Sequence, residues 1–369
     1  MKLNKHNLKF PFYARFAFIA IGAFAFVYTL YVGQHIILPV IYATIIAILL
    51  NPLVNFLVRK KCNKTLAIIV AVVVAIFIIF CLFYFISIQI SLFGDTYPKL
   101  KGKFNATSEH AIHWVSQHFN IEPIKIDAWI AKTESEAVNN IGSAISQTLS
   151  TIGSVLTIVV LLPVYLFMIL FYRDLLLEFI KKLFNATHHI TVFEILTNSK
   201  KIIQNYLIGL LVEAAIIATL NSIGLLCLGV DYAIILGITG ALLNIIPYIG
   251  GVIAIALPML IAYVTKESSS AAIFVLMLYL AIQFIDNHFI IPRVVASKVK
   301  INALISIIVV LAGGALWGIP GMFLSIPLTA IMKVVFDHIE PLKPWGFLLG
   351  NIVPITPMKI KFITKKFNK

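Results

Sequence analysis

Long stretches of the chain contain no Asp, Glu, Lys or Arg. Five of them cover residues 16–58, 65–94, 137–172, 232–265 and 301–332. Because a bilayer core about 30 Å thick is crossed by roughly 20 helical residues, each stretch is long enough for at least one crossing, and the first is long enough for two. Gly33, Gln34 and His35 form the expected turn between those two. The pattern predicts a multi-pass membrane protein.

Six unbroken apolar helices are expected along the chain. They cover residues 16–32, 36–57, 66–93, 151–172, 205–229 and 271–292. The remaining charge-free stretches, 232–264 and 301–332, are each interrupted by Gly and Pro and form two helical pairs. The fold class predicted is all-α: a polytopic membrane protein of about eight transmembrane or re-entrant helical segments.

Composition excludes a soluble globule and disfavours a secretory signal. The chain is 60% hydrophobic and 12% charged, with a mean hydropathy of +1.00, so it has too little polar surface to coat a water-soluble domain of 369 residues. Lys2 to Arg15 precede an apolar run, as in a signal peptide. That run is too long for a signal core, no small-residue cleavage site follows it, and more spans come at once.

Two segments outside the spans have helical spacing of apolar residues. In residues 95–150, two amphipathic helices are expected, and the second is expected to continue into the span that begins near residue 151. Residues 173–201 repeat the pattern more weakly, which predicts a helix at the membrane surface. The chain therefore divides into a three-span region, 1–93; an extracytoplasmic insertion, 94–150; a fourth span with the surface helix, 151–204; a C-terminal core, 205–340; and a basic tail, 341–369.

The distribution of basic residues predicts the orientation. The net charge is +14, and 23 of the 29 Lys and Arg fall in segments that one topology places on a single side. Cytoplasmic loops of membrane proteins are enriched in Lys and Arg, so both termini are predicted to be cytoplasmic. A nucleic-acid partner is disfavoured because membrane spans separate small basic clusters.

The two interrupted stretches carry most of the functional argument. Each arm has about 15 residues and reaches roughly 22 Å, short of the roughly 30 Å core, so each pair is either a re-entrant hairpin or two packed helices joined by a Gly-rich turn. Broken backbone at membrane depth must be buried in protein or line a cavity. The motif residues are Pro247, Tyr248, Gly250, Gly251 and Pro258 in the first stretch, and Gly313, Gly314, Gly318, Pro320, Gly321 and Pro327 in the second.

A weak internal repeat links these stretches. Residues 251–258 resemble residues 321–327 at an offset of about 70 residues, and each broken stretch follows one long span. Each unit then crosses an odd number of times, which is the inverted-repeat plan of many secondary transporters. Coincidence in so apolar a sequence is the alternative.

Few ionisable groups lie inside the spans. Glu213 and Asp286 are predicted in the inner half of their helices, with polar neighbours Asn221, Asn244, Gln283 and Asn287. A charged residue at a helix centre costs about 2.5–3.5 kcal/mol, so it usually faces a partner or water. If their helices are adjacent, the two carboxyls could share a proton or a cation. Alternatively, Asp286 is an interfacial cap and Glu213 a hydrogen-bonded acid between helices.

The C-terminal half resembles the autoinducer-2 exporter family of bacterial membrane permeases. The resemblance lies in residues 206–209, the Ile-Pro-Tyr-Ile-Gly-Gly string at 246–251 with Pro258, the Asp286-Asn287 pair with Pro292, and Gly313, Gly314, Gly318, Gly321 and Pro327. Span order, the 94–150 insertion and chain length also fit. Leu210 and Ala303 depart from the family pattern, which leaves the transported species undecided.

This resemblance implies an eight-helix transporter of the bacterial inner membrane, expected to form a homo-oligomer in the lipid bilayer. Some members are similar to exporters of autoinducer-2 and others to sodium/proton antiporters, so the expected partner is a small polar solute or signal molecule, or else Na⁺ and H⁺. A structural or assembly role is a third alternative. No nucleotide loop, metal-ligand cluster or nucleophile motif occurs, so neither an enzyme nor a cofactor is predicted.

Overall fold

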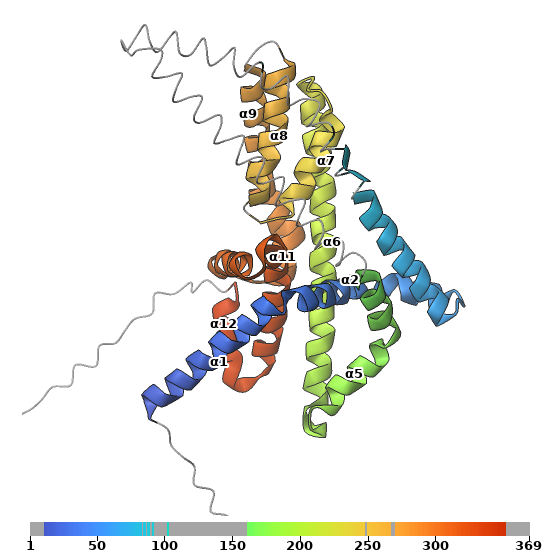
Figure 1. The fold of residues 1–369 in the computed structure, drawn as a ribbon, viewed down its shortest axis with the longest axis vertical. Coiled ribbons are helices and arrows are strands. Elements are labelled where there is room, and N and C mark those ends of the chain that lie inside the picture. The colour runs from blue at the N-terminus through green and yellow to red at the C-terminus, as the bar shows by residue number, and fades with distance from the viewer. Residues whose placement is uncertain are drawn as a thin grey trace, which may run out of the picture.

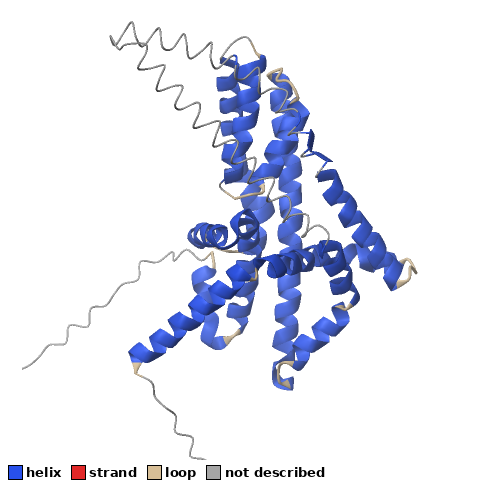
Figure 2. Ribbon diagram, viewed as in Figure 1, coloured by secondary structure: helices blue, strands red, loops and turns tan. Residues whose placement is uncertain are grey.

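The computed structural model describes residues 11–82, 161–247, 249–266 and 270–351, with a few isolated positions between 84 and 102. The described residues form helices joined by short turns (Figure 2). Six of these helices are long and apolar enough to cross a membrane, which confirms the all-helical, multi-pass prediction. The predicted helices of the 94–150 insertion, Tyr248 and most of the 341–369 tail lie outside the described residues.

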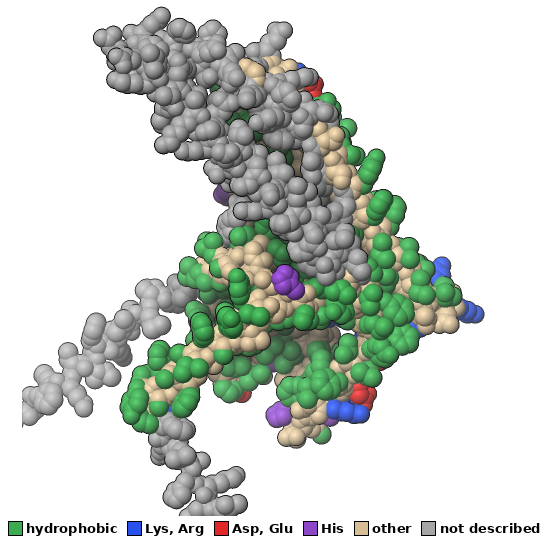
Figure 3. Space-filling view, in the orientation of Figure 1, with side chains coloured by type: hydrophobic (Ala, Val, Ile, Leu, Met, Phe, Trp, Pro, Cys, Tyr) green, Lys and Arg blue, Asp and Glu red, His purple; other side chains and the backbone are tan. Residues whose placement is uncertain are grey.

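The first two spans form where the sequence predicts them. Helix α1 (Phe12–Val32) and helix α2 (Gln34–Arg59) meet at Gly33, whose N–H donates to the Thr29 carbonyl at 2.8 Å. No residue of α1 is buried, and most of its apolar side chains are exposed. A third apolar helix, Lys64–Leu82, follows. Hydrophobic side chains cover most of the described surface in Figure 3, as expected of a chain whose solvent is lipid.

The fourth apolar helix, Leu161–Phe171, is tied to the first spans by polar contacts at its end. It is followed by the amphipathic helix α5 (Arg173–Lys182). Arg173 donates to Asn51 of α2 at 2.7 Å, and Lys64 donates to Asp174 at 2.7 Å. The hydrogen bond from Lys64 lowers the pKa of the Asp174 carboxyl.

The predicted surface helix is shorter than residues 173–201. Helix α5 ends at Lys182, a 3₁₀ turn (η1) covers Ala186–His188, and the next residues belong to another helix. The interruption lies at Asn185, whose backbone is extended (φ −61°, ψ 152°). Asn side chains compete for backbone hydrogen bonds and favour helix ends over helix interiors.

Helix α6 (His189–Cys227) is the central element of the fold. Its 39 residues extend about 58 Å, well beyond the hydrocarbon core. It contains the predicted span 205–229 up to Cys227 and starts 16 residues earlier, with no break between residues 204 and 205. In Figure 1, α2 crosses the middle of α6, and three later helices run beside its upper half.

The first Gly/Pro-broken stretch is a helical hairpin. Helix α7 (Ala233–Asn244) and helix α8 (Ile249–Thr265) are joined by a turn that includes Pro247. At the turn the backbones nearly touch, since a Cβ added to Gly250 would lie 1.7 Å from the Leu243 carbonyl oxygen. The far ends also lie together, because a Cβ on Gly229 would be 3.2 Å from Nζ of Lys266.

The second broken stretch folds back on itself too. Helix α11 (Ala303–His338) has non-helical angles at Trp317 and at Gly318, whose φ of 64° and ψ of −146° suit glycine alone. Beyond this break the two arms touch, since a Cβ on Gly313 would lie 2.5 Å from the Gly321 carbonyl oxygen. A straight helix of 36 residues would hold its ends about 54 Å apart. Instead Asn302, before the first arm, bonds Gly350 beyond the second. The predicted interruption at 313–321 is therefore confirmed, but the non-helical part is limited to two residues.

Between the hairpins lies a helix with an irregular end. Helix α9 (Ser270–Ile285) continues through two π-helical turns, η2 (Asp286–Ile290) and η3 (Pro292–Ala296), into the short α10 (Ser297–Val299). Pro292 lacks an N–H and would clash with the preceding turn of a regular helix, and a π-helical turn relieves such a conflict. After α11 come a 3₁₀ turn, η4 (Glu340–Leu342), and α12 (Lys343–Leu349).

The close approach of the two arms of α11 leads to a stability prediction. In Gly313→Ala the new methyl group would meet the Ser325 hydroxyl at 2.0 Å and the Gly321 carbonyl at 2.5 Å. Overpacking of this kind costs about 1–3 kcal/mol, so thermal unfolding of the purified protein in detergent should begin at a lower temperature. Gly22→Ala is the matched control, because nothing lies within 4 Å of its added methyl group. Equal stability of the two variants would contradict the hairpin packing.

Candidate functional site

Polar residues on α6, α7 and α9, together with two glycines of α7, occupy one face of each helix. On α9 and its π-helical end they are Tyr279, Gln283 and Asp286; on α6 they are Glu213 and Asn221; on α7 they are Gly237, Gly240 and Asn244. Spacings of three, four, seven and eight residues keep side chains on the same side of a helix. Helices α7 and α9 run along the upper half of α6 (Figure 1), and the three faces turn toward one another. We call this set the polar column.

The upper part of the polar column surrounds Gly240. A Cβ at this position would lie 3.1 Å from Nδ2 of Asn221 and 3.2 Å from Oη of Tyr279, so glycine leaves room for both. Asn221 is 2% exposed and Tyr279 is 4% exposed. Oδ1 of Asn221 and the Tyr279 hydroxyl have no hydrogen-bond partner among the described residues. Buried polar atoms of this kind are normally satisfied, so they are available to a ligand or water.

The middle of the polar column is formed by the tip of the α7–α8 hairpin. Nδ2 of Asn244 donates to Oδ2 of Asp286 at 2.9 Å. A Cβ on Gly251 would lie 3.1 Å from Oε1 of Gln283 and 3.5 Å from Oδ1 of Asn244. The broken hairpin therefore delivers its polar end directly to the carboxyl on the neighbouring helix.

The lower end of the polar column contains both carboxyl groups singled out in the sequence. Asp286 is 0% exposed and Glu213 is 6% exposed. Glu213 lies on α6 and Asp286 at the end of α9, and these two helices pack against each other. Oδ1 of Asp286 has no hydrogen-bond partner among the described residues. Since an uncompensated buried carboxylate is very costly, the pair requires a proton or a cation.

Asp286 also begins the π-helical turn η2. Asn287 and His288 lie on other faces of this turn and are exposed, whereas Asp286 is fully buried. Such π-bulges are frequent at functional sites.

Below the carboxyls the site is closed by an apolar cluster. Tyr206 of α6 packs there with Leu38 of α2, Val295 of η3 and Leu324 of α11. The tip of α11 is fixed in this layer, because Trp317 donates to the Leu30 carbonyl at 3.0 Å and Tyr42 donates to the Pro320 carbonyl at 3.1 Å. One hairpin therefore lines the polar column, and the other lies against the apolar layer beneath it.

Comparison with known proteins decides what kind of protein carries this arrangement. Residues 17–340 match the family model described as AI-2E family transporter. The chain belongs to the AI-2E transporter family. It is thus a multi-pass membrane protein of a bacterial transporter family, and not of an enzyme family.

Three curated relatives of the chain are transport proteins by name. The putative transport protein YueF of Bacillus subtilis is 24% identical over 69% of this chain and 70% of its own length. YrrI of the same organism is 31% identical over 36% of this chain and 37% of its own. The AI-2 transport protein TqsA of Escherichia coli is 30% identical over 35% of this chain and 37% of its own.

The structure brings only some of the predicted site residues of this AI-2E family chain together. Glu213, Asn221, Asn244, Gln283 and Asp286 meet in the polar column, with Gly250 and Gly251 at the hairpin tip. Asn287 points outward, Pro258 is buried within α8, and the second set of motif residues forms the α11 hairpin: Gly313, Gly314, Gly318, Pro320, Gly321 and Pro327.

Two residues of the site were not anticipated from the sequence. Tyr279 lies four residues before Gln283 and seven before Asp286, and this spacing would have placed it on their face. Trp317 gave no such signal, since its partner is the Leu30 carbonyl 287 residues away.

The polar column offers neutral hydrogen-bonding groups above a pair of carboxyls. Amide and hydroxyl groups suit an uncharged polar solute, and two close carboxyls suit a proton or a monovalent cation. Among the described residues, no group of three or more His, Cys, Asp or Glu could hold a metal ion.

The Asn244–Asp286 hydrogen bond predicts a coupled loss of stability. Asn244→Ala leaves a buried carboxyl oxygen without its donor, which costs about 1–3 kcal/mol, so thermal unfolding should occur at a lower temperature. In the double variant Asn244→Ala/Asp286→Ala, the loss should be smaller than the sum of the two single losses. The matched control is Asn287→Ala, on the exposed side of the same turn. Strict additivity would show that the two side chains do not interact.

Proposed function

We propose that this AI-2E family chain is a secondary transporter that exports a small polar solute or signal molecule through the polar column. The observation that carries the proposal is that three buried polar atoms of the polar column have no hydrogen-bond partner among the described residues: Oδ1 of Asn221, Oη of Tyr279 and Oδ1 of Asp286. Groups of this kind are costly inside a membrane protein unless a ligand or water satisfies them. They converge at the tip of a broken helical hairpin, which is where many transporters hold their substrate.

The proposed solute is uncharged and rich in hydroxyl or carbonyl groups. Asn221, Tyr279, Asn244 and Gln283 provide donors and acceptors without net charge, and they are the side chains nearest the hairpin. The name of the relative TqsA assigns transport of AI-2 to that protein. This supports testing the same signal molecule as a solute of the present chain.

The two hairpins are proposed to be re-entrant elements that enter the membrane from opposite faces. The ends of the α7–α8 hairpin lie together near Gly229 and Lys266, and those of α11 lie together near Asn302 and Gly350. Between these two places the chain runs along α9 once, so the open ends face opposite sides. This supports an inverted repeat within a transport core of residues 205–340 and a total of about eight membrane segments, with the flanking regions 1–93, 94–150, 151–204 and 341–369 around it.

Orientation and assembly follow from charge and exposure. The excess of Lys and Arg supports cytoplasmic placement of both termini in the bacterial inner membrane. The largely exposed apolar α1 supports packing against lipid or against a second copy in a homo-oligomer.

Sodium/proton antiport is the second candidate function. It is favoured by the burial of Glu213 and Asp286 on two packed helices and by Oδ1 of Asp286, which has no partner among the described residues. The same pair could couple solute export to an ion gradient, since moving one proton or cation through the site would neutralise the carboxyls in turn.

Flux measurements in inverted membrane vesicles test both functions. We expect Glu213→Gln and Asp286→Asn each to reduce gradient-driven uptake of labelled solute at least about tenfold, because neither variant can take up and release the coupling ion. Tyr279→Phe should weaken solute uptake but leave ion-driven pH changes intact. Autoinducer-2 is the first solute to test, with sodium and proton gradients imposed separately.

Glu194→Gln is the matched control, because Glu194 lies on α6 but is exposed and outside the polar column. Unchanged solute flux in both carboxyl variants would rule out ion coupling through them. Ion exchange without any solute movement would make antiport the function and reject the export proposal.

A further inference from the structure

A basic cavity lies beside α12, at the end of the molecule where both ends of α11 meet. Its volume is about 520 Å³, and its lining includes Lys300, Lys333, Lys343, Asp337, Phe347 and Asn351. This volume is in the range of pockets that hold small ligands, roughly 300–1,000 Å³. The cavity shares no residue with the polar column.

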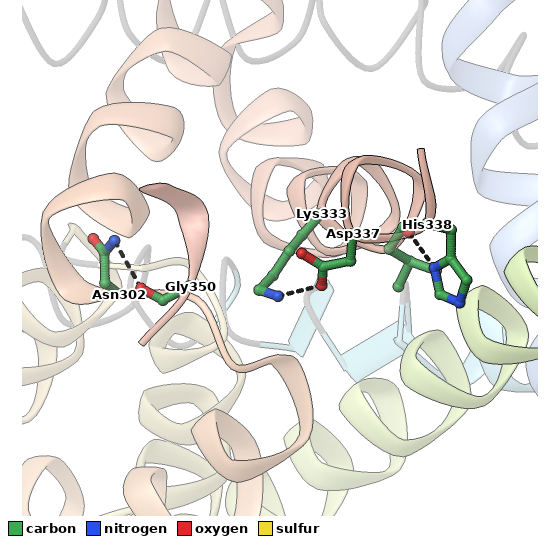
Figure 4. Close-up of polar contacts among 6 residues, drawn as sticks. Asn302, Lys333, Asp337, His338 and Gly350 are labelled. Atoms are coloured by element: carbon green, nitrogen blue, oxygen red, sulfur yellow. Dashed lines mark hydrogen bonds and ion pairs between the residues drawn. The ribbon is translucent and has the colours of Figure 1, made fainter. Parts of the chain in front are cut away.

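Asn302 and Gly346 position the segments that line this cavity. Asn302 caps α11 by accepting from the Ile305 N–H at 2.9 Å, and its Nδ2 donates to the Leu348 carbonyl at 2.7 Å. The same Nδ2 donates to the Gly350 carbonyl at 3.1 Å, as Figure 4 shows. Gly346 lets α12 approach the last turn of α11, since a Cβ there would lie 2.2 Å from Oδ1 of Asp337. Lys300, just before α11, and Lys333, near the end of α11, are thereby brought to one site.

The charge of the cavity is positive. Lys333 is paired with Asp337, as Figure 4 shows, and Lys343 is paired with Glu340. Lys300 has no carboxylate partner among the described residues. The lining thus contains three Lys and one Asp. An anion is the ligand that this balance favours.

Helix α12 presents aromatic and apolar side chains beside the cavity. Phe347 lines the cavity and is 59% exposed, and Trp345 and Leu348 of the same helix are 57% and 53% exposed. Trp is enriched where protein meets the headgroup level of a bilayer, because its ring is amphipathic. Apolar side chains beside Lys ammonium groups match a molecule with an anionic head and a hydrocarbon body.

We propose that this cavity binds the phosphate headgroup of an anionic membrane phospholipid, with Lys300 and Lys343 contacting the phosphate and the α12 side chains contacting the acyl chains. Bound lipid then joins the start and the end of the α11 hairpin at the membrane surface. This site is separate from the transported solute and stands or falls independently of it.

Binding can be measured by titrating the purified full-length protein in detergent with phosphatidylglycerol that carries brominated acyl chains, which quench nearby Trp fluorescence. We expect saturable quenching that is largely lost in Trp345→Phe. Phosphatidylcholine with the same brominated chains should bind at least about tenfold more weakly. Lys300→Gln and Lys343→Gln should each weaken phosphatidylglycerol binding about fivefold, as expected for one Lys near an anionic headgroup.

Lys298→Gln is the matched control, because it removes an exposed Lys two residues from Lys300 that does not line the cavity. It should leave the affinity unchanged. A loss in Lys298→Gln equal to that in Lys300→Gln would show general surface attraction and overturn the proposal, as would equal binding of phosphatidylcholine.

Inorganic phosphate separates a lipid site from a free-anion site. Phosphate in millimolar excess should compete only weakly, and phosphatidylglycerol alone should raise the temperature of thermal unfolding. If inorganic phosphate stabilises the protein as much as the lipid does, the site takes a soluble anion and the lipid assignment is wrong. Because thermal unfolding is recorded for every variant, a misfolded variant is recognised and replaced by the milder Lys300→Arg, which should retain binding.

Discussion

Lipid offers no hydrogen bonds, so each polar group that this chain places in the bilayer must find its partner within the protein. Most of the fold can be understood from this constraint. The backbone is broken at residues 245–247, which are half-buried, and at 317–318. Trp317 and Tyr42 supply hydrogen bonds between α11 and the first two helices, which would otherwise share only apolar contacts at that point.

The same constraint singles out the polar column. Where the chain satisfies its polar groups, as with Asn244 and one oxygen of Asp286, the bond fixes the hairpin tip to α9. Among the described residues, the other oxygen of Asp286, the Tyr279 hydroxyl and Oδ1 of Asn221 have no hydrogen-bond partner, and all three belong to this column. Glycines at 237, 240, 250 and 251 allow the helices to approach closely enough for this, with Ser222, Asn221, Leu243 and Gln283 as their nearest neighbours. Small residues thus determine both the packing and the position of the site.

Much of this arrangement could be predicted from the sequence, for identifiable reasons. Charge-free runs and Gly/Pro breaks are local signals, and they located the spans and both interruptions. The isolated carboxyls Glu213 and Asp286 were visible because acidic residues are so rare in the apolar segments. Helix continuity was harder: nothing local showed that α6 begins at His189, or that the surface helix stops before Asn185. Contacts between distant segments, such as Trp317 with Leu30 or Asn302 with Gly350, have no sequence signature at all.

Helix α6 has a mechanical consequence. Its 39 residues exceed the roughly 20 needed to cross the hydrocarbon core, so about half of the helix extends beyond that core. Its first turns carry the exposed Glu194, and its C-terminal half carries Glu213 and Asn221. Because the helix has no break, a rotation of its His189 end, near α5, is transmitted along the backbone to Glu213 and Asn221. Helix α6 thus connects the surface outside the membrane with the polar column without passing through either hairpin.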